Sequence, residues 1–347
     1  MSETSSTSTE ARPAVQPAEP TEPVAPGAVR SSSYGWFAAR FAVIGVWALL
    51  IVVFCLLRPD TFMTTGTFKT ILGGSSQTTL VFLTAALLCT ILVGEFVDMS
   101  IASNFGLSAT LVTVLNVNHG WNVWLAALIG LVAATVVGAI NGWLVVRVNV
   151  NTIVVTLGMG TLLLGIALWL ANLMPVSGLP ASFEKIATQP IFGLPIGFFY
   201  GLLLMIGFAY LLHVTPLGRN MRFVGENREV SRLAGVQVTR IRMGAFTIGG
   251  FIAGLGGVLA VAQTGGFDPN SSQAYLLPIF AATFLGTAVL QPGRFNPLGT
   301  LIAVFFLATG VLGLQLLGAT SWVSNVFYGG VLVVAVTIST VLHQRSR

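Results

Sequence analysis

The 347-residue chain is far more apolar than a soluble globular protein, because 54% of its residues are hydrophobic and only 8% are charged. Its mean hydropathy is +0.87, which excludes a soluble domain and indicates an integral membrane protein. The net charge of +5 therefore does not point to nucleic acid, since excess arginine is typical of the cytoplasmic loops of membrane proteins.

Residues 1–34 differ in composition from the rest of the chain. They are rich in Ser, Thr, Pro, Glu and Ala and contain almost no large apolar side chain. Such a segment cannot bury enough surface to fold, so we expect a disordered cytoplasmic tail followed by one transmembrane domain, 35–347. The segment is not a signal peptide, because it is long and leads into a full-length apolar stretch without an obvious cleavage site.

Ten apolar stretches follow the tail in close succession. Several have about the 20 residues that a bilayer core requires, whereas two are short and favour broken or tilted helices. We expect an all-α fold, a polytopic transmembrane helical bundle of about ten spans, with an error of one or two. The stretches are 37–57, 69–93, 100–116, 121–146, 151–171, 196–213, 243–263, 275–290, 298–317 and 321–342.

Loop charge gives the orientation of these spans. If the N-terminus is cytoplasmic and the ten spans alternate, thirteen of the sixteen basic residues fall on the cytoplasmic side. Only Arg58, Lys69 and Lys185 fall outside. This asymmetry predicts that both termini and the arginine-rich loop 214–242 are cytoplasmic.

Two carboxylates, Glu95 and Asp98, lie between the second and third stretches in the sequence GEFVDMS. Burying an ionisable group in a membrane is costly, so such a group is a candidate for function. If this segment is a helix break, Asp98 and Ser100 would bind freed backbone groups beside a polar path through the membrane. If the spans simply end here, the carboxylates lie at the cytoplasmic surface. For Asp98 we favour the fixing of a break or turn over direct contact with a solute.

The loop from Thr215 to Arg242 carries six arginines and must project into water. Its segment Gly225–Val236 predicts a short helix. Asn227 is the expected N-cap, and Gly235 lies where a helix C-cap needs a positive φ. Such a helix suits either a membrane surface or a protein partner. Its expected apolar face is formed by Val230, Leu233 and Ala234, and Glu226 and Glu229 are expected at its N-terminal end.

Little in the chain predicts catalysis. The two lysines are not part of a phosphate-binding loop, the three histidines lack metal-ligand spacing, and the two cysteines lie in apolar runs. We therefore expect neither an enzyme nor a bound metal or cofactor. The turn 264–270, TGGFDPN, contains Asp268 and Asn270 and is either a plain connection or the lip of an external vestibule.

Several motifs together resemble the permease subunit of bacterial ABC importers for monosaccharides, of the ribose, xylose and arabinose type. The resemblance runs from about Thr67 to Leu342, and five motifs occur in the family's order and spacing. Asp98-Met99-Ser100 is similar to the family's GGIDLSVGS, and Asn141 lies in a GAINGWLV similar to its GxxNGxLV. The family's VTLG motif is similar to Thr156-Leu157-Gly158. Its TxFGR…GxNxxAAxxSGI loop is similar to the TPLGR sequence here with the GxN and GV that follow it. The match continues in order from Pro269-Asn270 to Thr300.

The resemblance implies a mechanism and partners. The segment after Thr215 would be a coupling helix that docks in a groove of a separate ABC ATPase, and a second permease subunit and an extracytoplasmic solute-binding protein would complete an importer in the bacterial inner membrane. The solute would be a small sugar or polyol. The expected coupling residues are Gly225, Glu226, Asn227, Val230, Leu233, Ala234 and Gly235, and those expected at the path or helix break are Asp98, Ser100, Asn141, Asp268 and Asn270.

The chain also departs from the family pattern. Glu95 and Phe96 stand where the family has a glycine pair, and Leu276 and Pro278 replace its usual acidic positions. These differences leave the coupling motif unchanged and concern the solute. Two alternatives therefore remain. One is a permease for branched-chain amino acids, which should offer more polar groups to a zwitterion. The other is a secondary transporter driven by an ion gradient, which needs ionisable groups along its path.

Overall fold

The computed structural model describes residues 33–95, 97–320 and 322–345. The tail expected to be disordered, 1–34, lies outside this part of the chain except for its last two residues, which belong to α1 (Ser33–Leu57). The described residues are predominantly helical, which confirms the expected all-α membrane protein.

All ten expected stretches coincide with helices. The longer ones are α1, the consecutive helices α3 (Thr65–Gly73) and α4 (Ser75–Ile91), α6 (Val123–Val146), α7 (Thr152–Leu170), α9 (Ile196–Val214), α12 (Val238–Thr264), α14 (Pro297–Leu316) and α15 (Trp322–Arg345). Within the described part of the chain, six helical segments are long and apolar enough to cross a membrane: Thr65–Ile91, Val123–Val146, Thr152–Leu170, Ile196–Val214, Val238–Thr264 and Pro297–Leu316.

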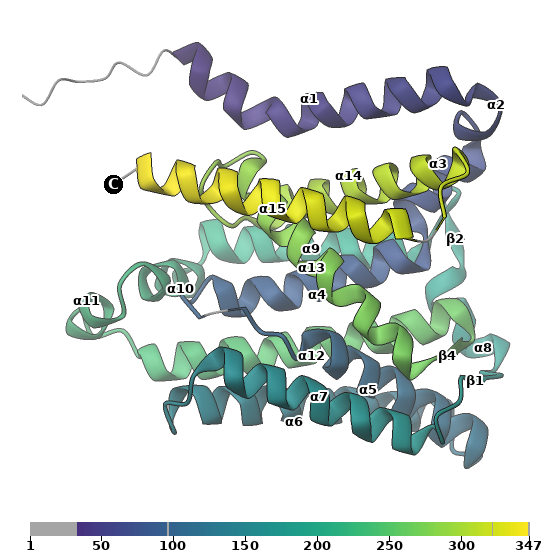
Figure 1. The fold of residues 1–347 in the computed structure, drawn as a ribbon. Coiled ribbons are helices and arrows are strands. Elements are labelled where there is room, and N and C mark those ends of the chain that lie inside the picture. Colours follow the sequence, from purple (N-terminus) through teal and green to yellow (C-terminus); the bar gives the residue numbers. More distant parts are fainter. Residues whose placement is uncertain (1–32, 96, 321, 346–347) are drawn as a thin grey trace, which may run out of the picture.

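The two short stretches are short helices that begin partway across the bundle. α5 (Ile101–Thr113) follows residues 92–95 and 97–100, none of which is helical, and ends in a π-helical turn, η1 (Val114–Asn118). α13 (Leu276–Leu285) follows the 3₁₀ helix η2 (Pro269–Tyr275) and ends in η3 (Gly286–Ala288). Figure 1 shows α5 confined to one half of the bundle. The shortness of these stretches therefore reflects broken helices.

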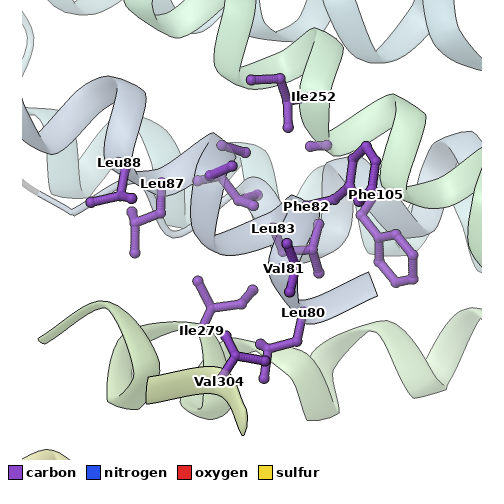
Figure 2. Close-up of a cluster of buried hydrophobic side chains, with 14 of the residues drawn as sticks. Leu80, Val81, Phe82, Leu83, Leu87, Leu88, Phe105, Ile252, Ile279 and Val304 are labelled. Atoms are coloured by element: carbon purple, nitrogen blue, oxygen red, sulfur yellow. The ribbon is translucent and has the colours of Figure 1, made fainter. Parts of the chain in front are cut away.

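The core surrounds α4, which is buried at almost every position from Thr78 to Thr90. Its leucines and phenylalanine contact Phe105 of α5, Ile252 of α12, Ile279 of α13 and Val304 of α14 in one apolar cluster (Figure 2). A helix that is buried on all sides has no polar face, which is why this stretch is apolar all round.

The remaining elements cluster at the two ends of the bundle. α10 (Pro216–Glu226), α11 (Arg228–Leu233), the start of α1 and the C-terminal end lie at one end in Figure 1. The opposite end carries α2 (Pro59–Phe62), α8 (Ala181–Thr188) and two antiparallel strand pairs. These pairs join β1 (Val176–Ser177) to β4 (Gly266–Phe267) and β2 (Pro190–Ile191) to β3 (Leu194–Pro195).

Glycines allow α6 and α12 to cross at close range. A Cβ atom at Gly250 would lie 2.6 Å from the carbonyl oxygen of Ala134 and 2.9 Å from the Cα atom of Gly138. Backbone atoms cannot move aside as a side chain can. The small residues of these two helices therefore serve close packing.

We expect Gly250→Ala to lower the melting temperature of the purified protein in detergent. The added methyl group must separate α6 from α12, and overpacking of this kind costs about 1–3 kcal/mol. Gly244→Ala is the matched control, because it lies on the same helix and its Cβ would meet no atom within 4 Å. Equal melting temperatures for the two variants would show that the crossing is not tight.

Candidate functional site

The water-facing segment after α9 forms two short helices, where the sequence predicted one. Thr215 caps α10 by accepting a hydrogen bond from the Gly218 amide at 3.2 Å, and Pro216 occupies the first turn. Glu226 is the last residue of α10 and directly precedes Asn227, the N-cap of α11, so it lies on the N-terminal side of the coupling helix but outside its first turn. Only Glu229 lies in the first turn of α11.

α11 has the predicted caps. The Asn227 side-chain oxygen accepts hydrogen bonds from the amides of Glu229 and Val230, both at 3.0 Å. Gly235 follows the helix with a φ of +80°, a conformation in which glycine carries no steric penalty. The helix therefore begins and ends where the sequence predicted.

α11 presents apolar side chains to its surroundings. Leu233 is 79% exposed and Val230 is 49% exposed. Phe223, on α10, is also exposed, although the sequence analysis did not select it. An aromatic residue inside an arginine-rich segment is the signal that would have identified it. Exposed apolar groups rimmed by charges are typical of interaction surfaces.

α12 begins at Val238, so the arginine-rich segment ends earlier than the expected loop 214–242. Arg240 and Arg242 therefore lie in the first turns of α12, not in a loop. The side chain of Arg242 is only 13% exposed and points to the bundle. The charges of the surrounding sequence do not show that Arg242, unlike the neighbouring arginines, is largely buried.

The segment 92–95 packs directly against the junction of α10 and α11. A Cβ atom at Gly225 would clash with the carbonyl oxygen of Leu92, and one at Gly94 would lie 3.1 Å from the Cα atom of Gly225. Gly94 also has a φ of +75°. Both positions therefore need glycine, and the two backbones meet without an intervening side chain.

Glu95 lies at this contact. Its side chain is 2% exposed and forms ion pairs with Arg228, at 3.2 Å, and with Arg242. The hydroxyl group of Thr152, at the start of α7, donates to the same carboxylate at 3.1 Å. Arg228 also donates to the carbonyl oxygen of Gly94. Glu95 was not among the residues that the sequence predicted for the site.

The next residues form the helix break before α5. The Asp98 carboxylate accepts hydrogen bonds from the Ser100 amide at 2.9 Å and from the Ser100 hydroxyl at 2.7 Å. Asn141 of α6 donates to the same hydroxyl oxygen at 2.9 Å, and Thr156 of α7 accepts from the Met99 amide at 3.1 Å. The structure thus brings Asp98, Ser100 and Asn141 into one buried network.

Asp268 and Asn270 lie outside that network, at the end of the bundle away from α11. Asp268 caps η2 by accepting from the Asn270 amide at 3.0 Å. Asp268 also borders a cavity of about 200 Å³. The other lining residues are mainly hydroxyl-bearing and aromatic: Ser75, Thr79, Thr264, Ser271, Tyr275, Phe105 and Phe267, with Ala260 and Gly266.

No group of three His, Cys, Asp or Glu side chains in the described part of the chain lies close enough together to hold a metal ion. The charged side chains of the site form ion pairs and helix caps where α10 and α11 meet the helix break.

Comparison with known proteins agrees with the resemblance seen in the sequence. Residues 78–336 match a family model described as branched-chain amino acid transport system / permease component. The autoinducer 2 import system permease protein LsrD of Escherichia coli is 28% identical over 319 residues, which cover 90% of this chain and 94% of the relative. The protein of the same name from Shigella flexneri matches with the same identity and coverage. No solved structure matches the chain.

Proposed function

The chain belongs to the family of branched-chain amino acid transport system permease components, and from that premise we propose that it is the membrane subunit of an ATP-driven importer for a small sugar or polyol. The expectation of an importer permease, which is a transport subunit and not an enzyme, is confirmed by the family. The observation that carries the coupling part of the proposal is α11, a capped helix with exposed Leu233 and Val230 beside the arginines.

The coupling residues are proposed to be Gly225, Glu226, Asn227, Val230, Leu233, Ala234 and Gly235. Asn227 and Gly235 delimit α11, and Gly225 lets the helix pair approach the break segment. Leu233 and Val230 would fill an apolar groove in a separate ABC ATPase. Closing of the ATPase dimer on ATP would then displace α11, and rocking of the helices would open the path to alternate sides.

For the solute we favour a sugar or polyol over a branched-chain amino acid. The cavity beside Asp268 offers hydroxyl groups and aromatic rings, and its lining contains no Arg, Lys or His to receive the carboxylate of a zwitterion. The relatives import autoinducer 2 according to their names, whereas the family description refers to amino acids. We propose Asp98, Ser100 and Asn141 for the helix break along the path, and Asp268 and Asn270 for its outer lip.

We propose ten spans, cytoplasmic termini and a location in the bacterial inner membrane. The start of α1, the C-terminal end and α11 occur at the same end of the bundle, which supports an even number of spans (Figure 1). Arg58, Lys69 and Lys185 belong to elements at the other end, as the positive-inside rule requires. A second permease subunit and an extracytoplasmic binding protein would complete the importer.

Reconstitution tests this function. The permease is purified with the ATPase and binding protein of the same importer. The binding protein is screened against monosaccharides by thermal shift, and the best solute is radiolabelled. We expect uptake into proteoliposomes at least about 10-fold above background only when ATP and the ATPase are both present. Uptake driven by an ion gradient without the ATPase would instead identify a secondary transporter.

Thiol labelling provides the control for orientation. A cysteine introduced at Arg232 should react with a membrane-impermeant reagent only in inverted vesicles, and one introduced at Lys185 only in right-side-out vesicles. Labelling of Arg232→Cys from outside would contradict the coupling role. Both variants are made in a protein in which the two native cysteines, Cys55 and Cys89, have been replaced, so that only the introduced cysteine can react.

A further inference from the structure

We propose that Glu95 is a positioning residue that fastens the helix break to α11 and α12, so that movement of the docking helix reaches Asp98. This inference rests on the proposed importer function. Glu95 touches neither the ATPase nor the solute in this proposal. It acts by holding two parts of the chain that lie more than 130 positions apart in sequence.

Two ion pairs connect Glu95 to two different helices. Its carboxylate is almost fully buried, and a buried charge is tolerated only when it is paired and hydrogen-bonded. Arg228, at the start of α11, and Arg242, in α12, supply the two positive charges. Each arginine comes from a different helix, so the carboxylate ties both helices to the segment that carries it. Losing this carboxylate would leave Arg242 buried without its partner.

Backbone contacts beside Glu95 reinforce the joint. Gly94 and Gly225 meet at van der Waals distance, and Arg228 donates to the carbonyl oxygen of Gly94. A side chain at either glycine would therefore push the junction of α10 and α11 away from the segment 92–95. A displacement of α11 must move this segment or break the contact.

α7 connects the joint to the break. Thr152 donates to the Glu95 carboxylate at 3.1 Å, and Thr156, one turn further on, accepts from the Met99 amide at 3.1 Å. Residues at i and i+4 share a helix face. Glu95 and Met99 therefore both contact one face of the first turns of α7, and Asp98 directly precedes Met99. α7 thus connects the ion pairs of Glu95 to the hydrogen-bond network of Asp98.

The joint also accounts for a departure in the sequence. Glu95 and Phe96 stand where the resembling family has a glycine pair, which carries no side chain to pair with an arginine. The joint at Glu95 is therefore a feature of this chain and not of the family's glycine-containing motif.

The test measures solute transported per ATP hydrolysed in the reconstituted complex. We expect Glu95→Gln to keep ATPase binding and ATP hydrolysis while transport per ATP falls about 10-fold. Asp60→Asn is the control, since it removes an exposed carboxylate at the opposite end and should match the wild type. A Glu95→Gln complex with wild-type transport per ATP would overturn the inference.

A double-mutant cycle separates a joint from general destabilisation. Arg242→Gln should also lower transport per ATP, and the double variant Glu95→Gln/Arg242→Gln should be no worse than the poorer single variant. If the losses of transport per ATP in the two single variants instead multiplied in the double variant, the inference would be overturned.

If Glu95→Gln yields too little folded complex, Thr152→Val removes only one hydroxyl group, and we expect transport per ATP to fall about 3-fold in this variant. Wild-type transport by Thr152→Val would then overturn the inference. Failure of the wild type itself to show ATP-dependent uptake would instead contradict the proposed function.

Discussion

Replacing Leu233 with glutamate is expected to abolish ATP-driven uptake while the permease remains folded. Leu233 is 79% exposed, so the permease loses no internal packing when it is changed. In the complex its side chain would be an apolar anchor, and a charge there would be desolvated without a partner. Loss of a central anchor costs about 2 kcal/mol or more, which weakens ATPase binding about 30-fold. Titration of the ATPase against detergent-purified permease measures this directly.

The control for Leu233 is Phe192, which is 96% exposed in the turn between β2 and β3 at the opposite end. Phe192→Glu introduces the same charge on an apolar residue that is even more exposed, and the affinity of this variant for the ATPase should equal that of the wild type. If Leu233→Glu also binds the ATPase with wild-type affinity, α11 is not the docking helix.

Replacing Asp98 with alanine is expected to reduce uptake at least 10-fold and to lower the melting temperature. The buried carboxylate satisfies both the amide and the hydroxyl group of Ser100, which is itself buried. Leaving such a donor unpaired costs about 1–3 kcal/mol. The same change frees the N-terminal end of α5 and disturbs the hydroxyl that Asn141 contacts. Asp98→Asn keeps an acceptor oxygen, so its uptake and its melting temperature should lie between those of Asp98→Ala and the wild type.

Asn122 provides a matched control for Asp98. Its side chain accepts a hydrogen bond from the Trp124 amide at 2.9 Å and caps α6, but it is exposed to solvent. Asn122→Ala should cost about 1 kcal/mol of stability, as exposed caps do, without an effect on uptake. If Asp98→Ala and Asn122→Ala prove indistinguishable in both measurements, Asp98 is an ordinary cap and the break has no special role.

The features that follow from neighbouring residues were predictable. The ten apolar stretches coincide with helices because a run of apolar side chains selects a helix in hydrocarbon wherever it occurs. Asn227 and Gly235 delimit α11 because a cap needs only a side-chain oxygen and a positive φ within a few residues. The separate helix α10, which ends at Glu226, was not predicted, and its Gly225 packs against Leu92 and Gly94, which are distant along the chain.

The partners of Glu95 were not predictable, and they set the geometry of the candidate site. Sequence analysis identified a carboxylate at membrane depth, but Arg228 and Arg242 lie 133 and 147 residues away along the chain. The contact between Gly250 and Gly138 and the hydrogen bond from Asn141 to Ser100 also join residues that are distant in the sequence, so they were not predictable either. The membrane class, the helices and the caps of α11 follow from the sequence alone, because they depend on apolar runs and on hydrogen bonds between near neighbours. Which glycines touch and which charges pair is visible only in the folded bundle, because these contacts depend on how separate helices pack together.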